Sequence, residues 1–282
     1  SIVLSDGPAG LRLNRFYEVV DGQAQRMPLV MSMDDGFLCK TPRELKGELR
    51  YQYCTAFPVG TLLAQTWNVD MIAEVGRAVA EEMKEFDTQL WLAPGMNIHR
   101  NPLCGRNFEY FSEDPIVSGE IAAAMVAGVE SDAKCGTTVK HFACNNCEDN
   151  RIHNNSVISE RALREIYLKG FETAIALSSP AAVMTSYNLI NGIHAANNYD
   201  LCTKVLRNEW GYKGLVMTDW TTTHNGEDCT ASGCMRAGND IVMPGCANDH
   251  EDLKRELKEG RLDIKDLRRS ASRIAECAIA LK

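Results

Sequence analysis

The chain has 282 residues, of which 45% are hydrophobic, and its formal net charge is −8 at pH 7. The length is close to the roughly 250 residues of a barrel of alternating strands and helices, and the apolar content allows a large buried core. The acidic balance without any basic run argues against a nucleic-acid partner. No apolar run approaches the roughly 20 residues of a membrane-spanning helix, so a soluble protein that does not insert into a membrane is expected.

Eleven cysteines are a high and odd number for a domain of this size. We expect reduced thiols rather than a disulfide framework, because such frameworks are typical of small secreted domains. Cys144 and Cys147 have the C-x-x-C spacing of metal and redox sites, but no second pair stands at zinc-site spacing. We therefore expect no metal and no cofactor, and a reducing cytoplasm or an anaerobic source.

The chain opens on the apolar stretch Ser1–Ser5, without an initiator Met and without a basic leader. This start predicts a fragment or a processed form of a longer protein. The region from Leu11 to Cys54 carries no repeat unit and is predicted to be a long loop with one or two short elements.

Short apolar runs alternate with longer amphipathic segments along the chain. Runs of this length that are bounded by turn residues are typical of buried strands. The predicted strands are Ile2–Leu4, Thr55–Val59, Gln89–Ala93, Thr137–Phe142, Ala181–Tyr187, Gly214–Thr218 and Asp240–Met243.

Helical patterns lie between these strands. Apolar residues from Ile72 to Phe86 recur three and four positions apart, which places one apolar stripe on a single helix face. Ser159 is a candidate N-cap for a helix over Glu160–Leu177, and Asp263 is a candidate N-cap for the last helix of the chain.

This alternation of strands and helices is the pattern of a parallel sheet, and the number of repeats favours a closed α/β barrel. The predicted fold is a TIM-like (β/α)8 barrel. An eighth strand is hard to place between Arg255 and Asp263, so the barrel is expected to be irregular or incomplete. No internal repeat or low-complexity linker marks a second domain, and residues 1–282 are predicted to form one domain.

Polar residues follow the predicted strands at their C-terminal ends. In a barrel this end carries the active site, because its loops vary while the strands hold positions fixed. Five strands that end in this way predict a polar, ligand-binding mouth. The residues are Asp6, Asn97 with His99, Lys140 with His141, Ser186 to Asn188, and Asp219 with Trp220.

The strand Gly214–Thr218 leads directly into Asp219 and Trp220. A carboxylate at the end of a buried strand is costly to keep charged unless it opens into a polar cavity. The neighbouring indole offers a flat apolar face that suits a sugar ring. Asp219 is therefore the candidate nucleophile.

The other polar side chains suit a neutral polyol better than an anion. Asp6 can accept paired hydrogen bonds from vicinal hydroxyl groups. Arg106 and Lys140 can donate to hydroxyl oxygens and can hold Asp219 ionised. Tyr187 adds a second flat face and a hydroxyl group.

Seven short motifs stand in order between Ser5 and about Gly245. They are Ser5-Asp6-Gly7-Pro8, Ala93-Pro94-Gly95-Met96-Asn97, Gly105-Arg106-Asn107-Phe108-Glu109, Ser112-Glu113-Asp114-Pro115, Lys140-His141-Phe142, Ser186-Tyr187-Asn188 and Met217-Thr218-Asp219-Trp220. This combination resembles glycoside hydrolase family 3, and most closely its bacterial β-glucosidase branch. A bacterial cytoplasmic location is expected on the same ground.

The resemblance implies a retaining exo-β-glycosidase with a TIM-like catalytic barrel. Its substrates would be β-linked gluco-oligosaccharides or β-glucosides, cleaved through a covalent glycosyl-enzyme intermediate on Asp219. A β-xylosidase specificity is the alternative. The sugar-binding residues that it implies are Asp6 on the far hydroxyls, Trp220 on the wall, and Arg106, Lys140, His141 and Tyr187 around the ring.

The same resemblance implies that part of the active site lies outside this chain. In this branch the acid/base is a Glu of a separate α/β sandwich domain, which is absent here. The His motif of the family's N-acetylglucosaminidase type is also absent, because Ala143-Cys144-Asn145-Asn146 follows Lys140-His141-Phe142. The barrel alone is therefore expected to be weak or inactive on alkyl glycosides, and to react slowly at best with aryl glycosides.

Several alternatives stay open. His141 can orient Asp219 or a loop, and paired with Lys140 it can be purely structural, as Tyr187 can be in the core. Arg106 can brace Glu109 or Asp114. The segment Cys144–Arg151 is expected to be an ordinary barrel loop. Four other carboxyl groups follow strands, and nothing in the sequence selects one as a general acid: Glu148, Asp149, Glu227 and Asp228.

Two further functions compete with hydrolysis. The first is a barrel that binds sugar without turnover. The second is a phosphate-binding metabolic barrel, which is disfavoured because no Gly-rich phosphate loop is followed by a helix.

Overall fold

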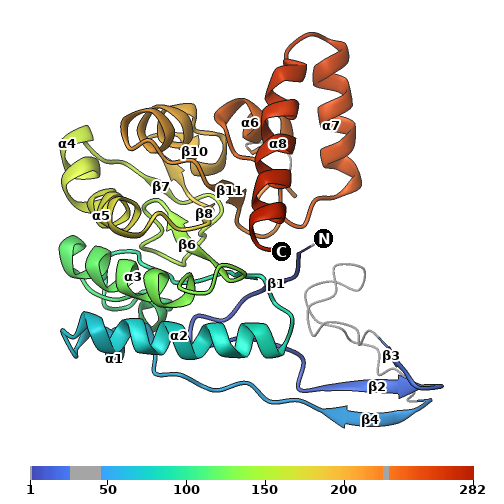
Figure 1. Ribbon diagram of the computed structural model, residues 1–282. Helices are drawn as coiled ribbons and strands as arrows, with labels where there is room; N and C mark the ends of the chain where they lie inside the picture. The colour runs from blue at the N-terminus through green and yellow to red at the C-terminus, as the bar shows by residue number, and fades with distance from the viewer. Residues whose placement is uncertain (1, 26–45, 225–228) are drawn as a thin grey trace.

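The computed structural model describes residues 2–25, 46–224 and 229–282. Its centre is a parallel sheet whose strand order is the same as the order along the chain (Figure 1). The five strands are β1 (Leu4–Ser5), β5 (Leu90–Trp91), β6 (Gly136–Phe142), β8 (Ala182–Thr185) and β11 (Leu215–Thr218). The predicted α/β fold with a parallel sheet is confirmed.

Helices connect the strands and cover the outer face of the sheet (Figure 1). The α-helices are α1 (Gly60–Ala64), α2 (Val69–Glu85), α3 (Pro115–Val129), α4 (Glu160–Ala162), α5 (Lys169–Ser178), α6 (Ala231–Ala237), α7 (Ala247–Lys258) and α8 (Ile264–Ala280). Two segments, Leu163–Tyr167 and Asp200–Glu209, have the wider π-helical turn.

The predicted helix signals are confirmed. In α2, Ile72, Val79 and Met83 of the predicted stripe are buried, while Val75 and Phe86 are half-buried. Asn68 caps the helix by accepting from Met71 N at 3.1 Å. Ser159 accepts from Ala162 N at 3.3 Å, and Asp263 accepts from Lys265 N at 2.9 Å. Each side-chain oxygen satisfies a backbone donor that has no partner within its helix.

The prediction of a strand at Thr55–Val59 is wrong. This segment is extended but mostly exposed, and it forms no ladder before α1 begins at Gly60. Its Phe57 N donates to Ala9 O, while Pro58 has no N–H to contribute to a ladder. The predicted last strand, Asp240–Met243, is reduced to a single bridge between Ile241 and Met217.

The barrel is incomplete. In the part of the chain that the structure describes, no strand lies between Arg255 and Asp263, where α7 ends and a turn leads into α8. Two small sheets lie outside the barrel. They are β3-β2-β4, from Gln23–Gln25, Phe16–Val20 and Glu48–Tyr51, and β10-β9-β7, from Ile193–His194, Leu189–Ile190 and Asn155–Ser156.

Alternation along the strands divides the core into two layers. Val183 and Val216 belong to the large cluster between the sheet and its helices. Met184, Leu215 and Met217 belong to a smaller cluster on the inner face of the sheet. Because Asp219 lies two residues beyond Met217, the same alternation directs it toward the interior at the C-terminal end of β11.

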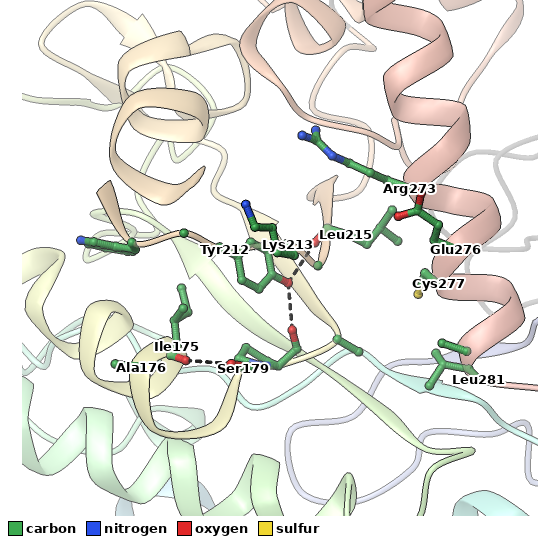
Figure 2. A pocket seen from close by; sticks show the side chains of 16 residues that line it. Ile175, Ala176, Ser179, Tyr212, Lys213, Leu215, Arg273, Glu276, Cys277 and Leu281 are labelled. Carbon is green, nitrogen blue, oxygen red and sulfur yellow. Dashed lines mark hydrogen bonds between the residues drawn. The ribbon is translucent and has the colours of Figure 1, made fainter. Parts of the chain in front are cut away.

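A cavity of about 510 Å³ lies at the opposite, N-terminal end of the strands (Figure 2). Leu215 at the start of β11 and Tyr212 line one side, and Cys277 and Leu281 from the end of the chain line the other. The Tyr212 hydroxyl donates to Pro180 O at 3.0 Å, and the charged side chains of Lys213, Arg273 and Glu276 also line the cavity. The polar mouth with Asp219 is therefore at the other end.

No helix in residues 2–25, 46–224 and 229–282 is long and apolar enough to cross a bilayer.

Candidate active site

The C-terminal ends of the parallel strands bring the predicted site residues together. Lys140 Nζ lies 2.7 Å from Asp6 Oδ1, which joins the ends of β6 and β1. His141 Nε2 lies 3.6 Å from Asp219 Oδ2, which joins the ends of β6 and β11. Arg106 comes from the loop after β5 and donates through Nη2 to His141 Nε2 at 2.8 Å.

Asp219 is buried, with 6% of its surface exposed. Its Oδ1 accepts from Trp220 N at 2.7 Å, and its own N–H donates to Thr185 O at the end of β8. Within the described residues, Oδ2 accepts no hydrogen bond of standard geometry. One carboxylate oxygen is thus fixed by the backbone, and the other is buried without a standard hydrogen bond, 3.6 Å from His141 Nε2.

The charge of Asp219 is set by opposing influences. Burial raises the pKa of its carboxyl group above the usual range, because a low-dielectric environment disfavours the ionised form. Arg106 and Lys140 act in the other direction, as do the Trp220 N–H and the hydroxyl of Tyr187, which faces the same carboxylate. The site therefore replaces part of the solvation that Asp219 loses on burial.

His141 is neutral in this arrangement. Burial, with the positive charges of Arg106 and Lys140, holds its pKa well below the usual value. A guanidinium group has donors only, so His141 Nε2 must accept the hydrogen bond from Arg106. The same nitrogen cannot then donate to Asp219. Of the alternatives that His141 orients Asp219 or a loop, this contact favours the loop, because Arg106 belongs to the loop after β5.

Arg106 also braces the loop that carries it. Its Nε donates to Glu109 Oε1 at 2.6 Å, while Asp114, the other suggested partner, caps α3 by accepting from Ile116 N. Arg106 therefore bridges Glu109 and His141 and lies between them at the edge of the site.

Asp6 is held between two cations. Lys140 Nζ lies 2.7 Å from Oδ1, and Arg12 Nη2 lies 2.9 Å from Oδ2. Burial acts to raise the pKa of Asp6, but Lys140 first, and then Arg12 and the Gly7 N–H, outweigh burial and lower the pKa. Asp6 is therefore an ionised acceptor. Arg12 was not expected from the sequence.

An irregularity in β6 lets Lys140 and His141 serve the same site. Lys140 pairs with Met184 of β8, but Phe142 pairs with Thr185, so one extra residue of β6 is accommodated at His141. Consecutive side chains of a regular strand point to opposite faces, and a bulge re-aims one of them. No local sequence signal marks this position.

Two further side chains fix His141. Asn97 accepts from His141 N at 2.8 Å and donates to His141 O at the same distance. The Tyr110 hydroxyl lies 3.1 Å from His141 Nδ1. Asn97 was noted as a strand-end residue, but its role was not predicted, and Tyr110 was missed. Its only signal was its position next to the Gly105–Glu109 motif.

Other strand-end polar residues hold loops instead. His99 Nε2 donates to Asn107 O at 2.9 Å, and Ser186 Oγ donates to Ala143 O at 2.8 Å. Asn188 Nδ2 donates to the same Ala143 carbonyl at 3.2 Å. These contacts fix the loops around the mouth.

The alternative acids are not equally placed. Glu148 is paired with Arg151 at 3.0 Å, and Asp149 is exposed. Glu227 and Asp228 lie outside the described residues.

No cluster of three or more potential metal ligands occurs in the ranges that the structure covers. Burial raises the pKa of Cys144 to about 12, which keeps this member of the C-x-x-C pair a thiol.

Residues 17–277 match the family model described as the glycosyl hydrolase family 3 N terminal domain. The chain belongs to this family. It is 48% identical over 223 residues to β-glucosidase A of Butyrivibrio fibrisolvens, a match that covers 79% of this chain and 26% of that relative. It is 43% identical over 217 residues to an exo-α-(1→6)-L-arabinopyranosidase of Bifidobacterium breve, covering 77% and 28% of the two chains.

Among solved structures, β-glucosidase 3B of Thermotoga neapolitana in complex with α-D-glucose superposes with a TM-score of 0.83 at 42% identity. The match covers 99% of this chain and 35% of that one. The family 3 resemblance, its β-glucosidase-like character and the incomplete (β/α)8-like barrel are thereby confirmed. The chain spans about a quarter of the length of the curated relatives that it matches.

Proposed function

We propose that this chain is the catalytic barrel of a retaining β-glucosidase, with Asp219 as the nucleophile. The observation that carries the proposal is the state of Asp219. The residue is buried at the end of β11, one oxygen is fixed by the Trp220 N–H, and Oδ2 is left without a standard hydrogen bond. A nucleophile needs such an uncommitted, charged oxygen at a fixed position.

In the proposed first step, Asp219 Oδ2 attacks the anomeric carbon, and the bond from that carbon to the leaving-group oxygen breaks. The leaving group takes a proton from a general acid, or departs as an anion if it is stable enough. Water then attacks the anomeric carbon and gives its proton to the group that acted as the acid, while the bond from that carbon to Asp219 breaks. Each step inverts the anomeric configuration, so the two together retain it.

The surrounding groups support a sugar in this position. Asp6 is an ionised acceptor for vicinal hydroxyl groups, and Lys140 and Arg106 are donors at the same mouth. Trp220 is 39% exposed beside Asp219, so its indole is accessible as an apolar wall. These features suit a neutral, hydroxyl-rich ligand.

The general acid is proposed to come from a separate α/β sandwich domain that supplies a Glu. Two observations support this division. Glu148 is engaged by Arg151, and the matches cover only about a quarter to a third of the relatives' lengths. The barrel alone would then be weak or inactive on alkyl glucosides, because their leaving groups need a proton.

Covalent trapping tests the nucleophile directly. The chain is incubated with 2,4-dinitrophenyl 2-deoxy-2-fluoro-β-D-glucoside, whose leaving group needs no acid, and is analysed by intact mass and peptide mapping. We expect one fluoroglucosyl adduct on Asp219 and none in Asp219→Asn. An adduct on another residue would refute the assignment. Binding of the reagent without any adduct would instead support the sugar-binding alternative.

The identity of the sugar is a separate question. The solved relative was crystallised with α-D-glucose, which favours glucose, but a 43% identical relative is named an arabinopyranosidase. Trapping with the matching 2-fluoro glucoside, xyloside and α-L-arabinopyranoside decides among them. We expect the glucoside to react fastest, and faster labelling by the xyloside would indicate the β-xylosidase alternative.

A further inference from the structure

The loop Cys144–Arg151 carries a contact that its sequence did not indicate. The guanidinium carbon of Arg151 lies 4.5 Å from the centroid of the Tyr187 ring. A guanidinium group stacked over an aromatic face is attracted by the electrons of the ring and restricts the ring's orientation. Arg151 therefore lies on the ring whose hydroxyl faces Asp219.

Arg151 is itself held in place by Glu148. Its Nη1 donates to Glu148 Oε2 at 3.0 Å, and Glu148 Oε1 accepts from Asn145 Nδ2 at 3.2 Å. Asn145 is fully buried and lies within 3.2 Å of the Tyr110 hydroxyl, which contacts His141. The charged pair is thus tied to the buried floor of the site, unlike an isolated surface ion pair.

Tyr187 is fixed at its backbone and is contacted on its ring by Arg151. Its backbone is fixed, because His194 Nδ1 donates to Tyr187 O at 2.9 Å. Its side chain is buried at the end of β8, adjacent to the strand that carries Asp219. The phenol hydroxyl favours the ionised form of Asp219 and so lowers the pKa of that carboxyl group.

We propose that Arg151, anchored by Glu148, is a positioning residue that holds the Tyr187 hydroxyl against Asp219. Arg151 acts through Tyr187. The role of Asp219 as nucleophile rests on the proposed function, but the positioning contact can be measured without any substrate. Glu148 is then an anchor of the loop, and not a general acid.

The measurement is the pKa of Asp219, followed by ¹³C NMR of its side-chain carboxyl in protein labelled at aspartate. The signal is assigned by its absence in Asp219→Asn. Tyr187→Phe removes the hydroxyl and should raise the pKa by about one unit, because a donor to the charged form is lost. Arg151→Gln should raise it by about half a unit or more, since the hydroxyl stays but is no longer held.

The double variant distinguishes an effect of Arg151 through the Tyr187 hydroxyl from a direct effect of the Arg151 charge on Asp219. Arg151→Gln added to Tyr187→Phe should move the pKa by less than about 0.2 unit, because the hydroxyl on which Arg151 acts is already absent. If the two shifts add in full, Arg151 acts on Asp219 through space and the proposal is overturned. It is equally overturned if Arg151→Gln alone changes nothing.

Arg161→Gln is the matched control, since Arg161 also pairs with a glutamate but its side chain is 84% exposed. It should leave the pKa of Asp219 unchanged. Glu148→Ala should shift the pKa in the same direction as Arg151→Gln, and thermal melts of each variant confirm that it is folded. If the fluoroglucoside labels nothing, the proposed function fails, while this titration still decides the positioning role.

Discussion

The role proposed for Asp219 needs a charged carboxylate, but the buried location of the residue disfavours charge. Its pKa is raised by burial in the folded chain, so between the unfolded and folded pKa values the native state binds more protons than the unfolded state. Stability therefore falls as pH rises through this window, and the ionised carboxylate lowers stability at neutral pH. The nearby cations reduce this effect but do not remove it.

Asp219→Asn should therefore stabilise the fold at pH 7. We expect a gain of roughly 0.5–2 kcal/mol, which corresponds to about 2–4 °C in Tm for each kcal/mol in a chain of this size. This difference in stability should vanish at about pH 3, where the carboxyl group of Asp219 is protonated in both the folded and the unfolded chain. Asp132→Asn is the control, because Lys134 N and Lys84 lower the pKa of Asp132. Removing this carboxylate should therefore slightly destabilise the folded chain at pH 7. A lower Tm for Asp219→Asn at pH 7 would contradict the account.

The labelling reaction should have one acidic limb, and that limb should belong to Asp219. Attack requires the carboxylate, so the rate falls as pH falls through a pKa that lies above the ordinary aspartate range. His141 stays neutral well below its usual pKa and should add no limb near about pH 6.5. The check is the pH profile of the labelling rate. A limb near 6.5 that disappears in His141→Gln would show that His141 titrates.

At the scale of elements, Asp240 joins three parts of the barrel. It is buried at the point where the last short extended segment begins. One oxygen accepts from Arg207 Nη2 at 2.6 Å and from Val216 N at 3.0 Å, and the other accepts from Arg273 Nη1 at 3.0 Å. These contacts tie β11, α8 and the segment Asp200–Glu209 to one carboxylate.

Asp240→Ala should be strongly destabilising. It leaves two partly or fully buried guanidinium groups without their carboxylate partner, which typically costs about 3–5 kcal/mol. Urea unfolding measures the change. Glu251→Ala is the control, because its pair with Lys254 is about 70% exposed on both sides and should contribute little to stability. If Asp240→Ala lowers the free energy of unfolding by less than about 1 kcal/mol, the contacts of Asp240 do not hold these parts of the barrel together.

The sequence predicted those elements whose signals are local. The strand before Asp219 and the caps at Ser159 and Asp263 depend on neighbouring residues and were found. Thr55–Val59 was misjudged because a short apolar run does not reveal whether another strand is available to pair with it. The bulge at His141 was also invisible, since it is a property of two strands together.

At the scale of the whole molecule, the ten cysteines that the structure describes are free thiols, and they are spread over both ends of the barrel. Cys277 lines the apolar cavity, whereas Cys144 begins the loop that ends at Arg151. A disulfide contributes roughly 2–4 kcal/mol, so its presence would be visible in the unfolding of the chain.

Reducing agent should therefore leave Tm unchanged to within about 1 °C. The unfolded protein, without prior reduction, should titrate eleven thiols with a chromogenic disulfide reagent, since the sequence has eleven cysteines. Nine titratable thiols, with a Tm that falls on reduction, would instead reveal a disulfide.

The candidate site was predictable in composition but not in mechanism. Strand ends and motifs indicated the six side chains around Asp219, because the ends of parallel strands converge. They did not indicate that His141 is neutral, that Arg12 pairs with Asp6, or that Arg151 lies on Tyr187. These facts depend on burial and on loop geometry, and neither is encoded in a local pattern.

The strand order of the sheet has a consequence for synthesis. Each parallel strand lies beside the one that precedes it in the chain, from β1 through β5, β6 and β8 to β11. A strand that leaves the ribosome therefore finds its neighbour already made, and the sheet can grow along one edge without waiting for a distant partner. Because β11 is the last of these five strands, the strands that lead to Lys140 and Tyr187 are made before Asp219.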